Sequence, residues 1–402
     1  MRTATIRLIG LIAAAGAVAA SPMVVRSAEW YMDGALRQQI SYDDNIGLRT
    51  NSNDRVSEFG ETSTIDMSVG GRSPTAEIDF NSVFDFTRFP DERSLNSNDQ
   101  YLTLSALKRG QRWTARMAGS FIRDTTRTSD VEDTGQFILQ NRRREVWRVG
   151  PEVTYQLTPV DQVGFSGLYS DTHYPSNNLR NFQQWGGTGN WSHSLTERTQ
   201  LLLIAAGFKN NSGSRGSQNS RYYIAQVGAA HMFTDQLAAR LTAGPTLADT
   251  DVVNVSGGTR TSSSDVNFGY GFDGSIDYQF QQRLLFSGSV FRTVTPSGTT
   301  GNIVEETGFR FNSTYDLFKN VYFETEALYK FREHVGQNTN TPRRDFVSFQ
   351  PGLRWNFLDD WNMRLAYRFR WQRFDRDDND EAFSNSVLAS VTYGIPPLTM
   401  SR

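Results

Sequence analysis

The feature of this sequence that most restricts its fold is an alternation of apolar and polar side chains with a period of two. It is clearest in the stretch "MRLAYRFRWQRF" at residues 363–374. Successive side chains of a strand point to opposite faces, so Met363, Leu365, Tyr367, Phe369 and Trp371 share one face. Arg364, Arg368 and Arg370 fall on the other face, whereas a helix would scatter both kinds around its surface. The alternation breaks at Arg373, which takes the apolar face, so we expect any membrane boundary to lie near it. The stretch predicts a strand with one face in water, which a soluble sheet that covers a core also contains.

The rest of the chain repeats this pattern and decides between a soluble and a membrane setting. Residues 266–280, 147–157 and 321–332 alternate in the same way, and the polar faces carry many charges. Faces this heavily charged do not line a dry core. Alternation over roughly fifteen residues is long for a soluble strand but suits a tilted strand that crosses a membrane. No amphipathic helix is evident between these segments, so we expect an all-β chain.

Short and long connections alternate between the expected strands. The short ones cover 158–162, 196–200, 234–237, 281–284, 318–320 and 359–361, and the long polar ones cover 210–220, 250–263, 333–344 and 375–384. This order is typical of a transmembrane up-and-down antiparallel β-barrel, in which the short turns lie in the periplasm. We expect about 18 strands within residues 30–394, in the outer membrane of a Gram-negative bacterium, with both termini periplasmic. A barrel of this size has an aqueous lumen by default, and residues 395–402 are expected to form a short periplasmic tail.

The N-terminus predicts export from the cytoplasm. Arg2 and Arg7 precede the apolar run "LIGLIAAAGAVAA", which small residues follow, as in a secretory signal peptide. We place the signal peptide at residues 1–20, with cleavage between 19 and 28. The chain has no cysteine, which excludes disulfides and thiolate sites, and its net charge of −2 gives no reason to expect nucleic acid as a partner.

Charged side chains on the polar faces are the candidate functional residues. By parity, Arg354, Arg364, Arg368 and Arg370 form a basic ladder on two neighbouring strands, and Glu306, Asp316, Glu324 and Glu326 lie on the two strands before them. Asp273, Asp277, Arg148 and Glu152 are further candidates for the wall of the lumen. Opposed ladders set a transverse field that orients a polar chain or screens ions. The alternative is that these charges pair with one another and only solvate the lumen, as in any wide barrel.

Metal binding and catalysis have weaker candidates. Asp43, Asp44 and Asn45, and the run "DRDDND" at 375–380, contain oxygen ligands for a hard cation, but neither follows a calcium-loop pattern. Asp and Asn are also favoured in turns, so a solvated passage from strand to loop is the preferred interpretation, and no metal site is predicted. The tempting catalytic group is Asp171 with His173, which share a face while Ser170 lies on the other. Because alternation supplies no nucleophile within hydrogen-bond reach, we expect no enzyme and no cofactor.

The segment "SYDDNIGL" at residues 41–48, soon after the signal peptide, resembles the opening of a β-barrel porin family that accompanies exopolysaccharide and exosortase systems of Gram-negative bacteria. The resemblance extends as architecture over the mature chain. It implies a role in passing polysaccharide across the outer membrane. One departure is the C-terminus, since such barrels usually end on an aromatic residue that the assembly machinery recognises, whereas here "IPPLTMSR" follows Tyr393.

The strand pattern predicts a passive outer-membrane channel, and the resemblance implies that this channel exports a surface exopolysaccharide. Its expected partners are outer-membrane lipid, the polysaccharide, export proteins of the periplasm and inner membrane, and the barrel assembly machinery. The alternative is a general diffusion porin for small polar solutes. A structural or adhesive barrel and an outer-membrane hydrolase are weaker possibilities.

Overall fold

The computed structural model describes most of the chain as one continuous sheet. It describes residues 29–127, 141–175, 179, 181–213, 218–256, 259–281, 283–296, 303–334, 343–374 and 380–401. The predicted signal peptide at 1–20 and most of the acidic run at 375–380 lie outside these ranges. No helix among the described residues is long and apolar enough to cross a membrane.

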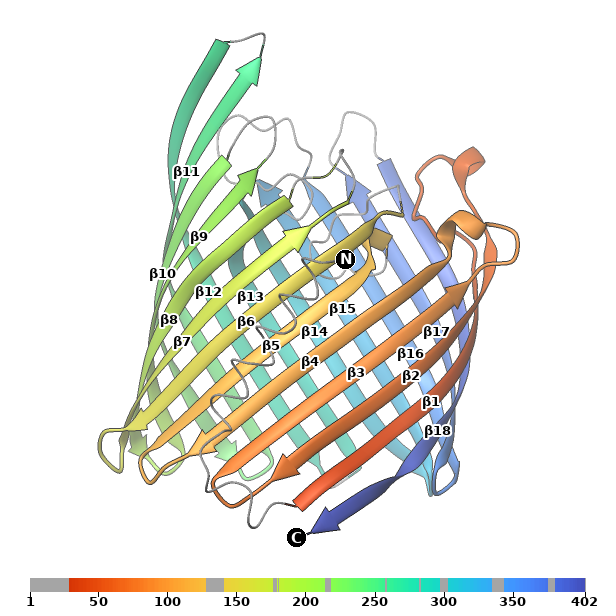
Figure 1. The fold of residues 1–402 in the computed structure, drawn as a ribbon, viewed down its shortest axis with the longest axis horizontal. Coiled ribbons are helices and arrows are strands. Elements are labelled where there is room, and N and C mark those ends of the chain that lie inside the picture. The colour runs from red at the N-terminus through yellow and green to blue at the C-terminus, as the bar shows by residue number, and fades with distance from the viewer. Residues whose placement is uncertain are drawn as a thin grey trace.

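The sheet has 18 strands, as the sequence pattern predicts, and closes into an antiparallel barrel (Figure 1). The strands are β1 (Glu29–Asp43), β2 (Glu58–Arg72), β3 (Ala76–Arg88), β4 (Ser97–Arg109), β5 (Trp113–Thr125), β6 (Arg143–Gln156), β7 (Asp161–His173), β8 (Asn181–Thr196), β9 (Thr199–Gly213), β10 (Gln218–Thr234), β11 (Leu237–Ser256), β12 (Thr259–Phe280), β13 (Leu284–Pro296), β14 (Ile303–Phe318), β15 (Val321–His334), β16 (Arg344–Leu358), β17 (Trp361–Phe374) and β18 (Asp380–Ser401). Two short 3-10 turns, η1 (Ser52–Asp54) and η2 (Arg93–Leu95), lie in connections.

The barrel closes through β1, which pairs with β2 on one side and with β18 on the other. The β1–β18 ladder runs from Glu29 opposite Ser401 to Asp43 opposite Ser386. The first and last described strands therefore start and end at the same end of the barrel. We call this the turn end, because tight turns such as 319–320 and 359–360 lie there, and we call the opposite end the loop end.

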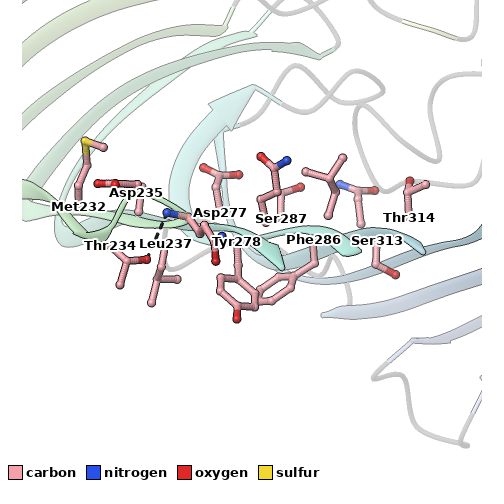
Figure 2. A pocket seen from close by; sticks show the side chains of 15 residues that line it. Met232, Thr234, Asp235, Leu237, Asp277, Tyr278, Phe286, Ser287, Ser313 and Thr314 are labelled. Carbon is pink, nitrogen blue, oxygen red and sulfur yellow. Dashed lines mark hydrogen bonds between the residues drawn. The ribbon is translucent and has the colours of Figure 1, made fainter. Parts of the chain in front are cut away.

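The two faces of the wall follow the predicted alternation. On β17, Met363, Leu365 and Tyr367 are exposed on the outside. Figure 2 shows the division at the turn end, where Asp277 points to one side of the sheet and the rings of Tyr278 and Phe286 to the other. The exposed large apolar side chains thus cover the outside of the barrel, and charged side chains such as Asp277 face its lumen.

The height of the outer apolar band is set by the first outward charges. Arg123, Lys209 and Arg373 occupy outward positions about ten residues along their strands from the turn end. A strand that crosses a bilayer at a tilt needs about 9–11 residues. The band therefore matches the hydrocarbon thickness of a membrane, and its upper edge lies near Arg373, where the sequence pattern placed it.

Two boundaries differ from the sequence-based expectation. Residues 250–263 are not a long loop, since Thr250 pairs with Asp265 and Ser256 with Thr259, and this hairpin rises above the other strands at the top left of Figure 1. The β-branched residues of the two strands favour extension. The last strand also continues beyond Gly394, because residues 395–401 belong to β18 and pair with the beginning of β1. Pro396 and Pro397 interrupt that ladder only locally, at the irregularity between Met32 and Gly34.

A charge placed on either face of β14 distinguishes lipid contact from water contact. We expect Phe311→Arg to lower the free energy of unfolding by about 2–4 kcal/mol, as arginine does at the midplane of a barrel's lipid face. The adjacent Asn312→Arg is the matched control, because Asn312 lies opposite Glu326 on the lumen face. Urea unfolding of barrels folded in lipid vesicles measures both. Equal losses for the two variants would contradict the assignment of faces.

Candidate functional site: the charged lumen and its mouth

The lumen wall of β15–β17 holds a network of ion pairs. Arg354 Nε lies 2.7 Å from Glu324 Oε1, and Arg364 Nε lies 3.0 Å from Glu324 Oε2. Arg364 also reaches Glu326 at 3.0 Å. The carboxylates stand on β15 and the arginines on the next two strands, so neighbouring ladders of opposite sign face each other along the wall. The predicted basic ladder is therefore neutralised locally by its acidic neighbours.

Glu306 on β14 forms the most deeply buried part of this network. It pairs with Lys330 at 3.2 Å and with Arg332, and all three side chains are at most 7% exposed. Charges that are out of water need partners, because an unpaired buried charge is costly. The sequence pattern predicts the lumen position of Glu306 but not its pairing with Lys330 and Arg332 on β15. The pairing makes this region a rigid part of the wall.

The loop end of the wall is held by Asp43, the last residue of β1. Its carboxylate accepts hydrogen bonds from Ser384 and Ser386 of β18, both at 2.7 Å, and from Arg370 of β17 at 2.8 Å. Arg368 lies 3.6 Å away. Asp43 is 4% exposed and therefore belongs to the closure of the barrel. It is neither solvated, as the sequence suggested, nor part of a cluster of metal ligands among the described residues.

The following residues of "SYDDNIGL" extend the same closure. Asp44 accepts hydrogen bonds from the backbone and side-chain amides of Asn385, both at 2.7 Å. Asn45 donates to the carbonyl oxygen of Phe383 at 3.0 Å and to that of Arg49 at 3.0 Å. These contacts bind the beginning of the first long connection to the beginning of the last strand. The motif that carries the family resemblance therefore fixes the loop end of the barrel.

This connection then turns inward and buries an apolar side chain against the wall. Leu48 is 1% exposed and packs with Phe346 and Ala382, beside Leu328. Its carbonyl oxygen accepts a hydrogen bond from Gln372 at 2.7 Å. Leu48 adopts a φ of 44°, which is strained for a branched side chain and is tolerated because its surroundings fix it. An apolar anchor inside the lumen thus holds the first connection in place.

A charged hollow lies where these segments meet at the loop end. We call it the mouth, a hollow of about 250 Å³ with a wall that runs from β15 through β18 and β1 to β4. Its charged lining consists of Asp43, Glu58, Asp85, Asp99, Arg127, Arg368 and Arg370. Only Arg368 and Arg370 are lumen candidates from the sequence pattern given above. The alternation along β2–β4 also predicts a lumen position for Glu58, Asp85 and Asp99. Arg127 follows β5, so no periodic pattern predicts its position.

Side chains from two connections narrow the mouth. The Arg127 guanidinium lies over the ring of Phe89, 5.1 Å from its centroid. Burial lowers the pKa of Arg127, while Asp99 and Asp43 raise it and Arg370 lowers it further, so the charged groups lie close together. Phe89 in turn covers Gly60, where an added Cβ atom would stand 2.7 Å from the ring. Gly60 therefore permits Phe89 to fold inward over β2.

The remaining predicted lumen residues lie apart from the mouth. Arg148 and Glu152 are exposed on β6, with Glu152 opposite Arg116 in the ladder with β5. Asp273 and Asp277 are exposed on β12, and Asp277 lines a hollow of about 430 Å³ at the turn end (Figure 2). Asp316 lies on β14, opposite Tyr322. Seven of the twelve predicted residues thus lie on β14–β17 and form ion pairs, Asp316 is half-buried on β14, and the other four are exposed.

Three histidines lie on the outer face of the strands. His193 lies 2.8 Å from Asp161 and stacks on Trp191, and His231 lies 2.9 Å from Thr199 Oγ1, both near the turn end. These positions suit interfacial aromatic residues. His173 lies opposite Glu145 near the loop end, and His334 ends β15 opposite Val304.

Removal of the Asp43 carboxylate tests its role in the closure. We expect Asp43→Ala to lower the free energy of unfolding by about 3–5 kcal/mol, because Arg370 is left buried without its charge partner. Urea unfolding in vesicles measures the loss. Asp235→Ala is the control, since Asp235 pairs with Arg198 in an exposed turn. A loss for Asp43→Ala no larger than that of the control would show that the buried pair does not hold the closure.

The comparisons with known proteins find similarity in overall architecture alone. No protein-family model matches the chain, and no curated protein matches its sequence. Among solved structures, the outer membrane protein OpdK from Pseudomonas aeruginosa is 12% identical, with 93% of this chain and 99% of that chain covered and a TM-score of 0.43. The ferric-catecholate import receptor Fiu from E. coli K12 is 7% identical, with 90% and 82% covered and a TM-score of 0.46. TM-scores this low add nothing to what the strand pairing already establishes.

Proposed function

We propose that this protein is a passive outer-membrane channel for small polar solutes. The closed barrel, its apolar outer band and its charged inner wall support this proposal. The single observation that carries it is the mouth, where Arg127 from beyond β5 and Phe89 from beyond β3 approach Asp43 and Arg370. Inward-folded segments restrict the width of a wide barrel. A restricted, charged mouth suits small hydrophilic solutes better than a bulky polymer.

The proposal includes an orientation. Short turns of bacterial barrels lie in the periplasm and long connections outside the cell, so the turn end is periplasmic. Both Glu29 and Ser401 lie at that end. Cleavage of a signal peptide within residues 1–28 and insertion by the barrel assembly machinery complete the proposed route to the membrane.

Export of an exopolysaccharide, which the "SYDDNIGL" resemblance implies, has less support. Asp43, Asp44 and Asn45 are engaged in binding β18. Leu48 is buried against the wall. The motif is therefore explained by closure of the barrel, without any contact to a polymer.

Conductance across planar lipid bilayers tests the channel. We expect open, ohmic conductance with wild-type protein. Arg127→Gln should shift the reversal potential in a salt gradient toward cation selectivity, and Asp85→Asn should shift it toward anion selectivity. A unit charge 4 Å from a passing ion contributes about 1 kcal/mol in water, so changes of up to about fivefold in the permeability ratio are expected. Arg198→Gln, in an exposed turn, is the control.

Two results would overturn the proposal. Absence of conductance from correctly folded barrels would exclude an open channel. Loss of extracellular polysaccharide in a deletion strain, restored by the wild type but not by a folded Arg364/Arg368/Arg370→Ser variant, would favour polymer export through the lumen.

A further inference from the structure

An apolar groove lies on the outer face of the barrel, away from the lumen. It spans β7–β11, has a volume of about 540 Å³ and is lined almost wholly by apolar side chains. Phe165, Trp191, Leu203 and Val227 form its walls. Because it lies within the apolar outer band, water does not fill it. Its occupant must be hydrocarbon or protein.

The floor of the groove is built from small residues at neighbouring positions. Gly189 lies opposite Phe165 and Ala205 in the two ladders that β8 forms. Ala205 lies opposite Ala225 in the next ladder. On β11, Pro245 has no N–H to donate, and the β10–β11 ladder has no paired residues between Ile224 and Val227, although the register is the same on both sides. Small side chains beside large ones leave a trough that is open toward the membrane.

A row of polar side chains crosses the same strands above the groove. Trp185, Lys209, Arg221 and Asp249 are successive partners across β8–β11. Each of these residues lies four positions closer to the loop end than the residue of the groove floor on the same strand. Four positions correspond to about 13 Å along a strand. This height coincides with the upper edge of the apolar band.

The two cations of this row differ in their surroundings. Arg221 lies 3.8 Å from Asp249, and both side chains are partly exposed. The Lys209 ammonium lies over the ring of Trp185, 5.3 Å from its centroid, and pairs with no carboxylate among the described residues. Asp251 stands one outward position beyond Asp249 on β11, and Asp171 stands on β7 opposite Gln183, so carboxylates flank the row at both edges. The side of the row on β8–β10 is positive.

We propose that this face binds a phosphorylated, multiply acylated glycolipid of the outer leaflet, of the lipid A type. Its phosphate contacts Lys209 and Arg221, and one acyl chain lies in the groove below. Lys and Arg are the usual partners of phosphate, and the apolar groove excludes any polar occupant. The source of the lipid rests on the proposed orientation, because the row belongs to the outer leaflet only if the loop end faces outward.

Native mass spectrometry of the detergent-solubilised full-length barrel tests this site. The probes are bisphosphoryl lipid A, its dephosphorylated form and dioleoyl phosphatidylglycerol. We expect the wild type to retain bisphosphoryl lipid A in preference to the other two. Lys209→Gln with Arg221→Gln should reduce affinity roughly twenty-five-fold, because each basic side chain near an anionic membrane surface contributes about a fivefold preference.

The groove is tested separately from the charges. Ala205→Leu with Ala225→Leu fills the trough and should reduce retention of lipid A and of its dephosphorylated form alike. Ala389→Leu fills an outward position on β18, and Arg373→Gln removes an outward charge from β17. Both controls should retain lipid A as the wild type does. Heat-dependent mobility in gels confirms that each variant is folded.

Three outcomes would overturn the site. Equal retention of lipid A by all variants would show that the lipid binds around the barrel without a specific site. Equal retention of phosphatidylglycerol would remove the preference for the glycolipid. A dimer without lipid, disrupted by the Ala205 and Ala225 variants, would assign the groove to contact between two copies of the chain. None of these outcomes depends on conductance, so failure of the lipid site and failure of the channel are distinguishable.

Discussion

The structure depends on satisfying every backbone hydrogen bond of a sheet whose outer surface is apolar. A strand edge in hydrocarbon would leave a row of donors and acceptors without partners, which costs several kcal/mol for each group. Pairing of β1 with both β2 and β18 removes the edges. Closure in turn gives the wall only two faces, one toward lipid and one toward the lumen. The period of two along the chain follows directly from this requirement.

Closure also has to occur in the correct register, because a slip of one residue would turn every side chain of β1 to the other face. Asp43 fixes this register at the loop end through Ser384, Ser386 and Arg370. Each of these partners lies on the lumen side, so a slipped strand would bury the carboxylate without them. A buried ion pair contributes little net stability compared with apolar packing, but breaking it is expensive. We infer that Asp43 contributes mainly to the specificity of closure.

The sequence predicts the properties that arise from local alternation. The number of strands, the faces of strands such as β17, the tight turns and the edge of the apolar band near Arg373 follow from it. It does not predict the contact between Asp43 and Arg370, because these residues are separated by almost the whole chain and meet only when the barrel closes. Nor does it predict the inward course of Leu48, Phe89 and Arg127, since connections carry no periodic pattern. It also does not predict the extension of β11 and β12, because the glycines and serines within residues 250–263 are typical of a loop.

The pairing of lumen charges bears on how the channel discriminates between solutes. Glu324 and Glu326 neutralise Arg354 and Arg364, and Asp43 neutralises Arg370, so the wall presents dipoles where an isolated ladder would present a uniform field. At the mouth, acidic residues from β1–β4 face arginines from β17 and from beyond β5. Because these opposite charges nearly balance, the mouth discriminates only weakly between cationic and anionic solutes. It still favours polar solutes over apolar ones. Size at the mouth and polarity along the wall are therefore the properties by which such a lumen selects.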